Sequence, residues 1–207
     1  CSCKFNIGGD IMSEIQANKL SPASGTALQV GDSGDTITIP SGATITNSGT
    51  ATGFGMSSAN TPMFAIKMSG NLDPSNGTWT LIPFDSEEID TDSAYTNTAS
   101  NYKFTVPSGE AGKYFIYGHV LINSLTNSDF IAGQLGIYKN GSRVVQSENN
   151  VRNTRTKYHT FNVAHVFDLS VGDYIQLYGS IDTDDGVGRI NSGENSVFGG
   201  FKLTWVH

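Results

Sequence analysis

Cysteine is nearly absent from this sequence: of its 207 residues, only Cys1 and Cys3 are cysteines. The rest of the chain therefore depends neither on disulfides nor on a cysteine-based metal site. Long apolar runs are absent too, because glycine and histidine interrupt the longest one, at residues 115–122. A membrane-spanning helix needs about 20 consecutive apolar residues, so we expect no insertion into a membrane.

Basic residues are also scarce. Twelve lysines and arginines stand against 19 acidic residues, which gives a formal net charge of −7 and an isoelectric point near 4.9. A chain of this charge lacks the broad positive surface through which proteins bind the phosphates of DNA or RNA. Nucleic acid is therefore not an expected partner.

Charge is scarcest at residues 20–66, which contain no lysine or arginine and only two acids, Asp32 and Asp35. Within residues 21–55, nineteen of thirty-five residues are Ser, Thr or Gly. Such a segment buries too little apolar surface by itself to offset the entropy lost on ordering. It is therefore either a flexible linker or a segment that identical neighbouring chains keep ordered.

A short repeat favours the second alternative. Thr-Ile-Thr occurs at residues 36–38 and again at 44–46, with Pro40-Ser-Gly between the two copies. β-Branched residues favour strands, whereas Gly and Pro supply bends. This short period is typical of β-solenoid coils and fibre shafts. The corners are marked by four glycines spaced nine, eight and seven residues apart, which are Gly25, Gly34, Gly42 and Gly49.

Three isoleucines within the repeat, Ile37, Ile39 and Ile45, argue against a pure spacer. If several chains bring these side chains together along one axis, they form a narrow apolar core that a single chain lacks. The pattern predicts that residues 21–61 form the β-repeat stem of a parallel homo-oligomer with cyclic symmetry, with these isoleucines as its core. A flexible Ser/Thr/Gly linker is the alternative.

From Pro62 onward the sequence contains aromatic residues, charges and the alternation of short strands, with no amphipathic helix. Residues 113–122 are apolar on both faces, which predicts an inner strand. Asn140-Gly141 between two strand-like runs predicts a tight hairpin. The whole pattern indicates an all-β sandwich or jelly roll. Strands are expected at residues 63–68, 79–83, 102–106, 113–122, 136–145 (a hairpin), 158–169, 174–181 and 197–206.

Seven short motifs support a more specific interpretation. They are Phe64-Ala-Ile, Ile82-Pro-Phe-Asp, Tyr102-x-Phe-x-x-Pro, Gly109-x-x-Gly-x-Tyr, Lys139-Asn-Gly, Leu169-x-x-Gly-Asp-Tyr-Ile-x-Leu and Phe198-Gly-Gly-Phe-x-Leu. In this order they resemble the globular head of complement component 1q, of the complement/tumour-necrosis-factor jelly-roll superfamily, over residues 62–207. The resemblance implies a ten-stranded jelly roll that packs as a homotrimer and caps a trimeric stalk.

No collagen-like Gly-X-Y run is present, so the β-repeat takes the place of the stalk. A jelly-roll head on such a stem also resembles fibre and appendage proteins of tailed bacteriophages. That resemblance implies a non-enzymatic virion structural protein on the particle surface. Residues 1–20 would anchor it to other virion proteins, residues 21–61 would form the stem, and residues 62–207 would form a head that attaches to a host surface. Met12-Ser13 resembles a translation start, and lipidation of Cys1 is the less favoured interpretation of the N-terminus.

Two other functions remain open at this point. One is a capsid decoration or cement protein with no external ligand. The other is a secreted adhesion ligand of the complement/tumour-necrosis-factor type, which would be extracellular. Catalysis is not expected, and neither is a cofactor. Gly31-Asp-Ser-Gly mimics the nucleophile segment of trypsin-like proteases, but no histidine precedes it and it lies within the repeat. No motif places a pair of catalytic carboxylates.

Ligand binding is expected in the polar loops at residues 85–101, 149–157 and 182–195, because loops vary without disturbing a sandwich. Their composition suits a hydroxyl-rich glycan or a protein on the host surface. The resemblance also makes Asp182, Asp184 and Asp185 a candidate calcium site, since related heads hold Ca²⁺ near the trimer apex. A solvated acidic loop is the alternative. The candidate ligand-binding residues are Asp182, Asp184, Asp185, Arg189, Asn191, Arg152 and Arg155.

Overall fold

The computed structural model describes residues 19–46, 48–49, 60–98, 100–126 and 128–204. The chain divides into two compact units, Cys1–Gly55 and Met56–His207. None of the described residues belongs to a helix that is long and apolar enough to cross a membrane.

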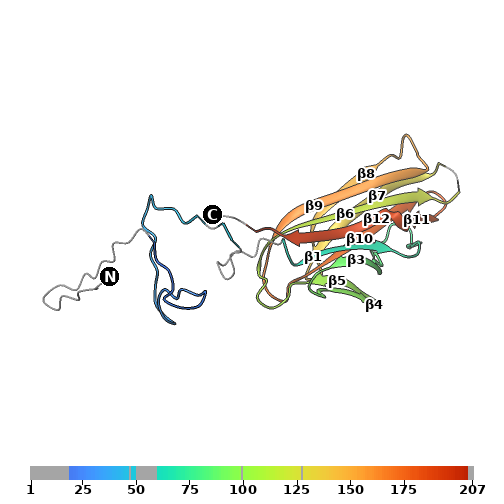
Figure 1. Cartoon of the computed structure of the whole chain (residues 1–207). Coiled ribbons are helices and arrows are strands. Elements are labelled where there is room, and N and C mark those ends of the chain that lie inside the picture. Colours follow the sequence, from blue (N-terminus) through green and yellow to red (C-terminus); the bar gives the residue numbers. More distant parts are fainter. Residues whose placement is uncertain (1–18, 47, 50–59, 99, 127, 205–207) are drawn as a thin grey trace. The chain divides into compact units, whose positions relative to one another are not determined.

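The second unit is built from two antiparallel sheets of six strands each (Figure 1). Sheet A consists of β1 (Met63–Met68), β3 (Ser86–Asp90), β6 (Gly112–Ser124), β9 (Tyr158–Leu169), β11 (Gly188–Ile190) and β12 (Gly193–Lys202). Sheet B consists of β2 (Thr80–Leu81), β4 (Tyr95–Thr98), β5 (Asn101–Thr105), β7 (Phe130–Lys139), β8 (Ser142–Asn150) and β10 (Tyr174–Thr183).

The strand order is that of a jelly roll. The order in sheet A is β3-β1-β12-β6-β9, with β11 beside the far end of β6, and the order in sheet B is β4-β5-β10-β7-β8. Most neighbours in a sheet are distant in the chain, as in a double Greek key. The ten strands of four or more residues make the sandwich, while β2 and β11 have two and three residues. The predicted all-β, ten-stranded jelly roll is confirmed.

The core lies between the sheets because inward residues alternate with outward ones along each strand. In β1 every second residue is buried, and Phe64 is 1% exposed. Its ring stacks on that of Phe104 at 4.6 Å between centroids and meets Phe198 edge-on at 5.1 Å. Aromatic packing of this kind joins the two sheets, since Phe104 belongs to sheet B.

Several sequence predictions are confirmed in detail. β1 and β9 occupy the expected residues, and β6 is an inner strand with β9 on one edge and β12 and β11 on the other. Asn140 and Gly141 form the tight turn between β7 and β8, with φ angles of 51° and 78°. Two positive φ angles are what the Asn-Gly hairpin requires.

The prediction of a loop at residues 85–101 is wrong, because these residues contain two strands. β3 pairs with β1, and β4 pairs with β5. Both are short and polar and lie at the edges of their sheets, where charged residues such as those of β3 are tolerated. The loops expected at 149–157 and 182–195 are also shorter than predicted, since β8, β10, β11 and β12 extend into them.

A carboxylate holds the turn between β9 and β10. Asp173 accepts hydrogen bonds from the Lys139 ammonium at 2.8 Å, from the Asn140 side-chain amide at 2.7 Å and from the Ser170 backbone N–H at 2.9 Å. The bond from Lys139, with those from Asn140 and Ser170, lowers the pKa of Asp173 from 3.8 to about 2. The aspartate thus ties the β7–β8 hairpin to the neighbouring turn.

We expect Asp173→Asn to lower the free energy of unfolding at pH 7 by on the order of 1 kcal/mol. Because the pKa is lower in the folded state, the carboxylate stabilises the fold above about pH 4, and this contribution is lost as the pH falls toward 2. Urea unfolding at both pH values should show the difference between variant and parent shrinking in acid. Asp168→Asn is the control, because that side chain is 78% exposed and should change nothing measurable. A difference that grows in acid would contradict the assignment.

The described part of the first unit contains turns but no strand. One turn is closed by the Ala43 N–H donating to the Pro40 carbonyl at 3.1 Å, with Gly42 at a φ of 87°. The expected corner at Pro40-Ser-Gly is therefore present. Ile37, Ile39 and Ile45 are 61%, 46% and 57% exposed in the single chain. The β-repeat stem, which needs neighbouring chains, stays a prediction.

The predicted anchor at residues 1–20 lies outside the described residues, except for Lys19 and Leu20. Both cysteines lie in that part.

Candidate functional site

Two of the predicted loops meet at one end of the sandwich through ion pairs. The Arg152 guanidinium lies 3.6 Å from the Asp182 carboxylate, and Arg155 pairs with Asp184. The backbone N–H of Asp184 also donates to the Asp129 carbonyl at 3.2 Å. Four of the seven predicted residues are thus brought together from distant parts of the chain. Exposed pairs of this kind stabilise a fold by about 1 kcal/mol or less, so they position the loops more than they hold the sandwich.

Asp185 caps the turn that follows β10. Its carboxylate accepts hydrogen bonds from the Thr126 hydroxyl and, at 2.9 Å, from the backbone N–H of Val187. The Thr126 hydroxyl first, and then the Val187 amide, lower the pKa of Asp185 to about 2. Asp185 is therefore ionised at neutral pH and fixed in orientation.

Arg189 and Asn191 make separate contacts. The Arg189 Nε and Nη2 atoms donate to the two carboxylate oxygens of Asp73 at 2.6 and 2.7 Å, which lowers the pKa of Asp73. This bidentate pair ties β11 to the segment before β2. The backbone N–H of Asn191 donates to the Leu121 carbonyl at 2.9 Å.

The three aspartates of the expected calcium site do not converge. Asp182 and Asp184 each face an arginine, whereas Asp185 faces Thr126. Ca²⁺ takes six to eight oxygen ligands, and within the described ranges no three acidic, histidine or cysteine side chains form a group that could hold a metal ion. Calcium binding stays a prediction, without a preformed ligand set.

The outer face of sheet A carries a row of apolar side chains that are exposed or only partly buried in the single chain. On β6 the ring of Phe115 lies 6.2 Å from that of Tyr117 and 5.6 Å from that of Phe201 on β12. Val166 on β9 lies opposite Phe115 and is 48% exposed. We call Phe115, Tyr117, Val166 and Phe201 the sheet A row. The signal in the sequence was the apolar second face of residues 113–122. Contiguous exposed apolar surface marks an interaction site.

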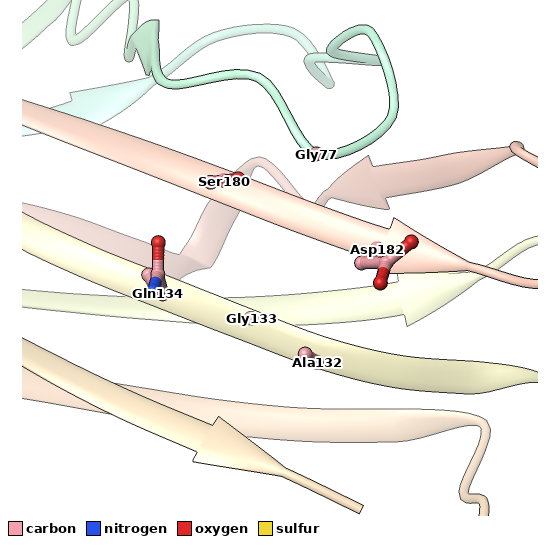
Figure 2. Close-up of a pocket in the computed structure, with 6 residues that line it drawn as sticks. All are labelled: Gly77, Ala132, Gly133, Gln134, Ser180 and Asp182. Atoms are coloured by element: carbon pink, nitrogen blue, oxygen red, sulfur yellow. The ribbon is translucent and has the colours of Figure 1, made fainter. Parts of the chain in front are cut away.

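The outer face of sheet B differs in being hollowed, and polar side chains line the hollow. A hollow of about 170 Å³ opens between β7 and β10 below the loop at Gly77 (Figure 2). Figure 2 shows the side chains of Gln134, Ser180 and Asp182 around it. Of these three residues only Asp182 was predicted to bind a ligand, and Gln134 and Ser180 were not among the predicted residues.

No family model matches this sequence, and no curated protein matches it. Among solved structures, the chain is similar to the globular domain of the zebrafish complement 1qA protein, with 14% identity over 70% of this chain and 99% of that chain and a TM-score of 0.47.

Proposed function

We propose that this chain is a non-enzymatic structural protein that assembles as a homotrimer and displays its jelly-roll head for attachment to a surface. The observation that carries the proposal is the sheet A row, in which Val166 is 48% exposed and the three aromatic side chains are only partly buried in a single chain. Covering such a row with identical copies removes it from water, and closed cyclic symmetry is the usual way to do so. Ile37, Ile39 and Ile45 are exposed in the single chain, and they are proposed to be covered by neighbouring chains in the same way.

More specifically, the chain is proposed to be a fibre or appendage of a tailed-phage virion. Residues 1–20 then bind other virion proteins, the repeat forms the stem, and the head contacts the host. Arg152, Arg155, Asp182 and Asp184, on two loops that meet, are proposed to take part in that contact. A secreted complement/tumour-necrosis-factor-like adhesion ligand fits the fold about as well, and a cement protein without an external ligand shares the trimer.

Val166→Asp tests the trimer. We expect the parent chain to form particles of three 22.1-kDa subunits. The trimer of the variant should already dissociate at a protein concentration at least tenfold higher than that at which the parent trimer dissociates. The reason is that burying one valine contributes about 1.5–3 kcal/mol and burying a charge costs more. Mass photometry of the full chain over a dilution series measures both. The control is Val171→Asp, at a 52% exposed turn position away from the sheet A row, and it should stay trimeric. A monomeric parent chain would contradict the proposal.

Attachment and location need a second experiment. If the chain is found in purified virions and its isolated trimer adsorbs to host cells, the fibre hypothesis is supported. Presence in virions without adsorption favours the cement protein, whereas release into particle-free medium favours the secreted ligand.

A further inference from the structure

Beside the hollow on sheet B lies a compact group of side chains, which we call the aromatic patch. It consists of three aromatic residues, Trp79, Tyr138 and Tyr178, and the Arg143 guanidinium over the Trp79 ring. The rings of Tyr138 and Tyr178 are 4.3 Å apart between centroids, and that of Trp79 is 6.0 Å from Tyr138. The Arg143 guanidinium lies 4.8 Å from the Trp79 ring centroid, a cation–π contact. All three rings are only partly buried, so the patch belongs to the surface and not to the core.

The position of Trp79 depends on Gly136, which has no side chain. Trp79 precedes β2, and β2 pairs with β10 at Tyr178. From there its indole ring reaches over to Gly136 on β7, where a Cβ atom would lie 3.1 Å from the ring and 3.2 Å from Arg143 Cδ. A glycine at the outward position of this central strand leaves the space that the indole occupies.

The aromatic patch and the hollow form one continuous strip. Along the paired strands β7 and β10, Gly136 faces Tyr178, and two residues further on Gln134 faces Ser180. Asp182 follows after two more residues, opposite Ala132. Since every second residue points to the same face, the strip from Tyr178 to Asp182 runs about 13 Å along the sheet.

The polar groups in the hollow are available to a ligand. Among the described residues, neither the Gln134 amide nor the Ser180 hydroxyl has a hydrogen-bond partner, although Ser180 is only 6% exposed. Asp182 accepts one hydrogen bond, from Asn76 at 3.0 Å, and faces Arg152 at 3.6 Å, which leaves acceptor capacity. Ser180 is nearly buried, and polar groups in such a position are normally satisfied by water or by a ligand.

We propose that this strip binds a neutral hexopyranose unit of a glycan. A sugar ring has an apolar C–H face, which packs on aromatic rings, and a rim of hydroxyls, which matches an amide, a hydroxyl and a carboxylate. The charges in the strip already have partners within the chain, since Asp182 faces Arg152 and Arg143 lies over Trp79, which favours a neutral ligand. The chain's net charge of −7 disfavours nucleic acid. An extended peptide pairs with an open strand edge, whereas the strip lies on the face of the sheet. The inference rests on the proposed attachment role and names its ligand class, on the face of sheet B where the strip meets the end loops at Asp182.

The test is binding of the full chain to immobilised neutral polysaccharides (glucan, galactan and mannan), with a polyuronate and a peptide library as contrasts. We expect binding to at least one neutral polysaccharide and not to the polyuronate. Trp79→Ala and Gln134→Leu should each weaken it at least tenfold, the first by removing the ring and the second by removing the hydrogen bonds. Trp79→Phe keeps a ring and should recover part of the binding. Tyr158→Ala, which removes an exposed aromatic ring on sheet A, should not change it.

Each variant is also checked for its melting temperature and trimer mass, so that misfolding is not mistaken for lost binding. If no neutral polysaccharide binds, or if binding is unchanged in both Trp79→Ala and Gln134→Leu, the sugar site is overturned. Binding to a peptide that Trp79→Ala abolishes overturns it as well. The trimer and its adsorption to host cells are measured separately, so the attachment role can survive the loss of this site.

Discussion

Phe64→Ala is expected to remove about 3–5 kcal/mol from the free energy of unfolding of the head, the range found when a buried phenylalanine is truncated. The ring is 1% exposed, and its centroid lies within 6 Å of the rings of Phe104, Phe198 and Tyr95. Its removal leaves a cavity at the point where the two sheets meet. Domains of this size are stable by only about 5–15 kcal/mol, so a large share of the stability is lost. Urea unfolding followed by circular dichroism measures the change.

Val144→Ala is the control for this truncation. Val144 lies on the edge strand β8 and is 49% exposed, so its loss should change the free energy of unfolding by less than about 0.5 kcal/mol. Equal losses in the two variants would mean that Phe64 does not join the sheets as described.

Gly200→Ala is expected to destabilise the head by about 3 kcal/mol, at the upper end of the range for overpacking. The glycine faces the core from β12. An added Cβ would lie 2.5 Å from Ile116 Cδ1, 2.8 Å from the Phe115 carbonyl oxygen and 3.0 Å from the Phe64 ring. The carbonyl belongs to the backbone of the paired strand β6 and has no alternative rotamer, so the strands themselves must separate.

The matched substitution is Gly70→Ala, at an exposed glycine that has no atom within 4 Å of the added methyl group and no restricted φ angle. It should be neutral, or stabilising by up to about 1 kcal/mol through the unfolded chain. Thermal unfolding of both variants measures the contrast. A mild Gly200→Ala variant would mean that β6 and β12 are less closely packed than the structure indicates.

The fold could be predicted from the sequence wherever one strand carried its own signal. β1 and β9 alternate regularly, and Asn140-Gly141 specifies its hairpin. β3 was missed because most of its residues are exposed and polar, so that no apolar face distinguishes it from a loop. Its strand conformation comes from hydrogen bonding to β1, which is tertiary information.

The candidate site was less predictable, because its residues meet only through strand register. Polar composition pointed to the loops that hold Arg152 and Asp182, but not to their pairing. Trp79, Tyr138 and Tyr178 come from three distant segments, and neighbouring strands bring them together. The sequence carried one signal for this site, which is that Tyr138 and Tyr178 occupy outward positions of their strands. Polar residues are the simpler expectation at such positions.

The central position of β12 in sheet A has a consequence for the synthesis of the protein. β12 lies between β1 and β6 and is the last of the twelve strands to leave the ribosome. Until then β1 lacks one of its two partners, and Phe64 lacks the ring of Phe198. Contacts between such distant segments also form slowly. A nascent chain that carries eleven of the twelve strands therefore exposes aromatic core surface, and its protection from aggregation falls to chaperones rather than to its own fold.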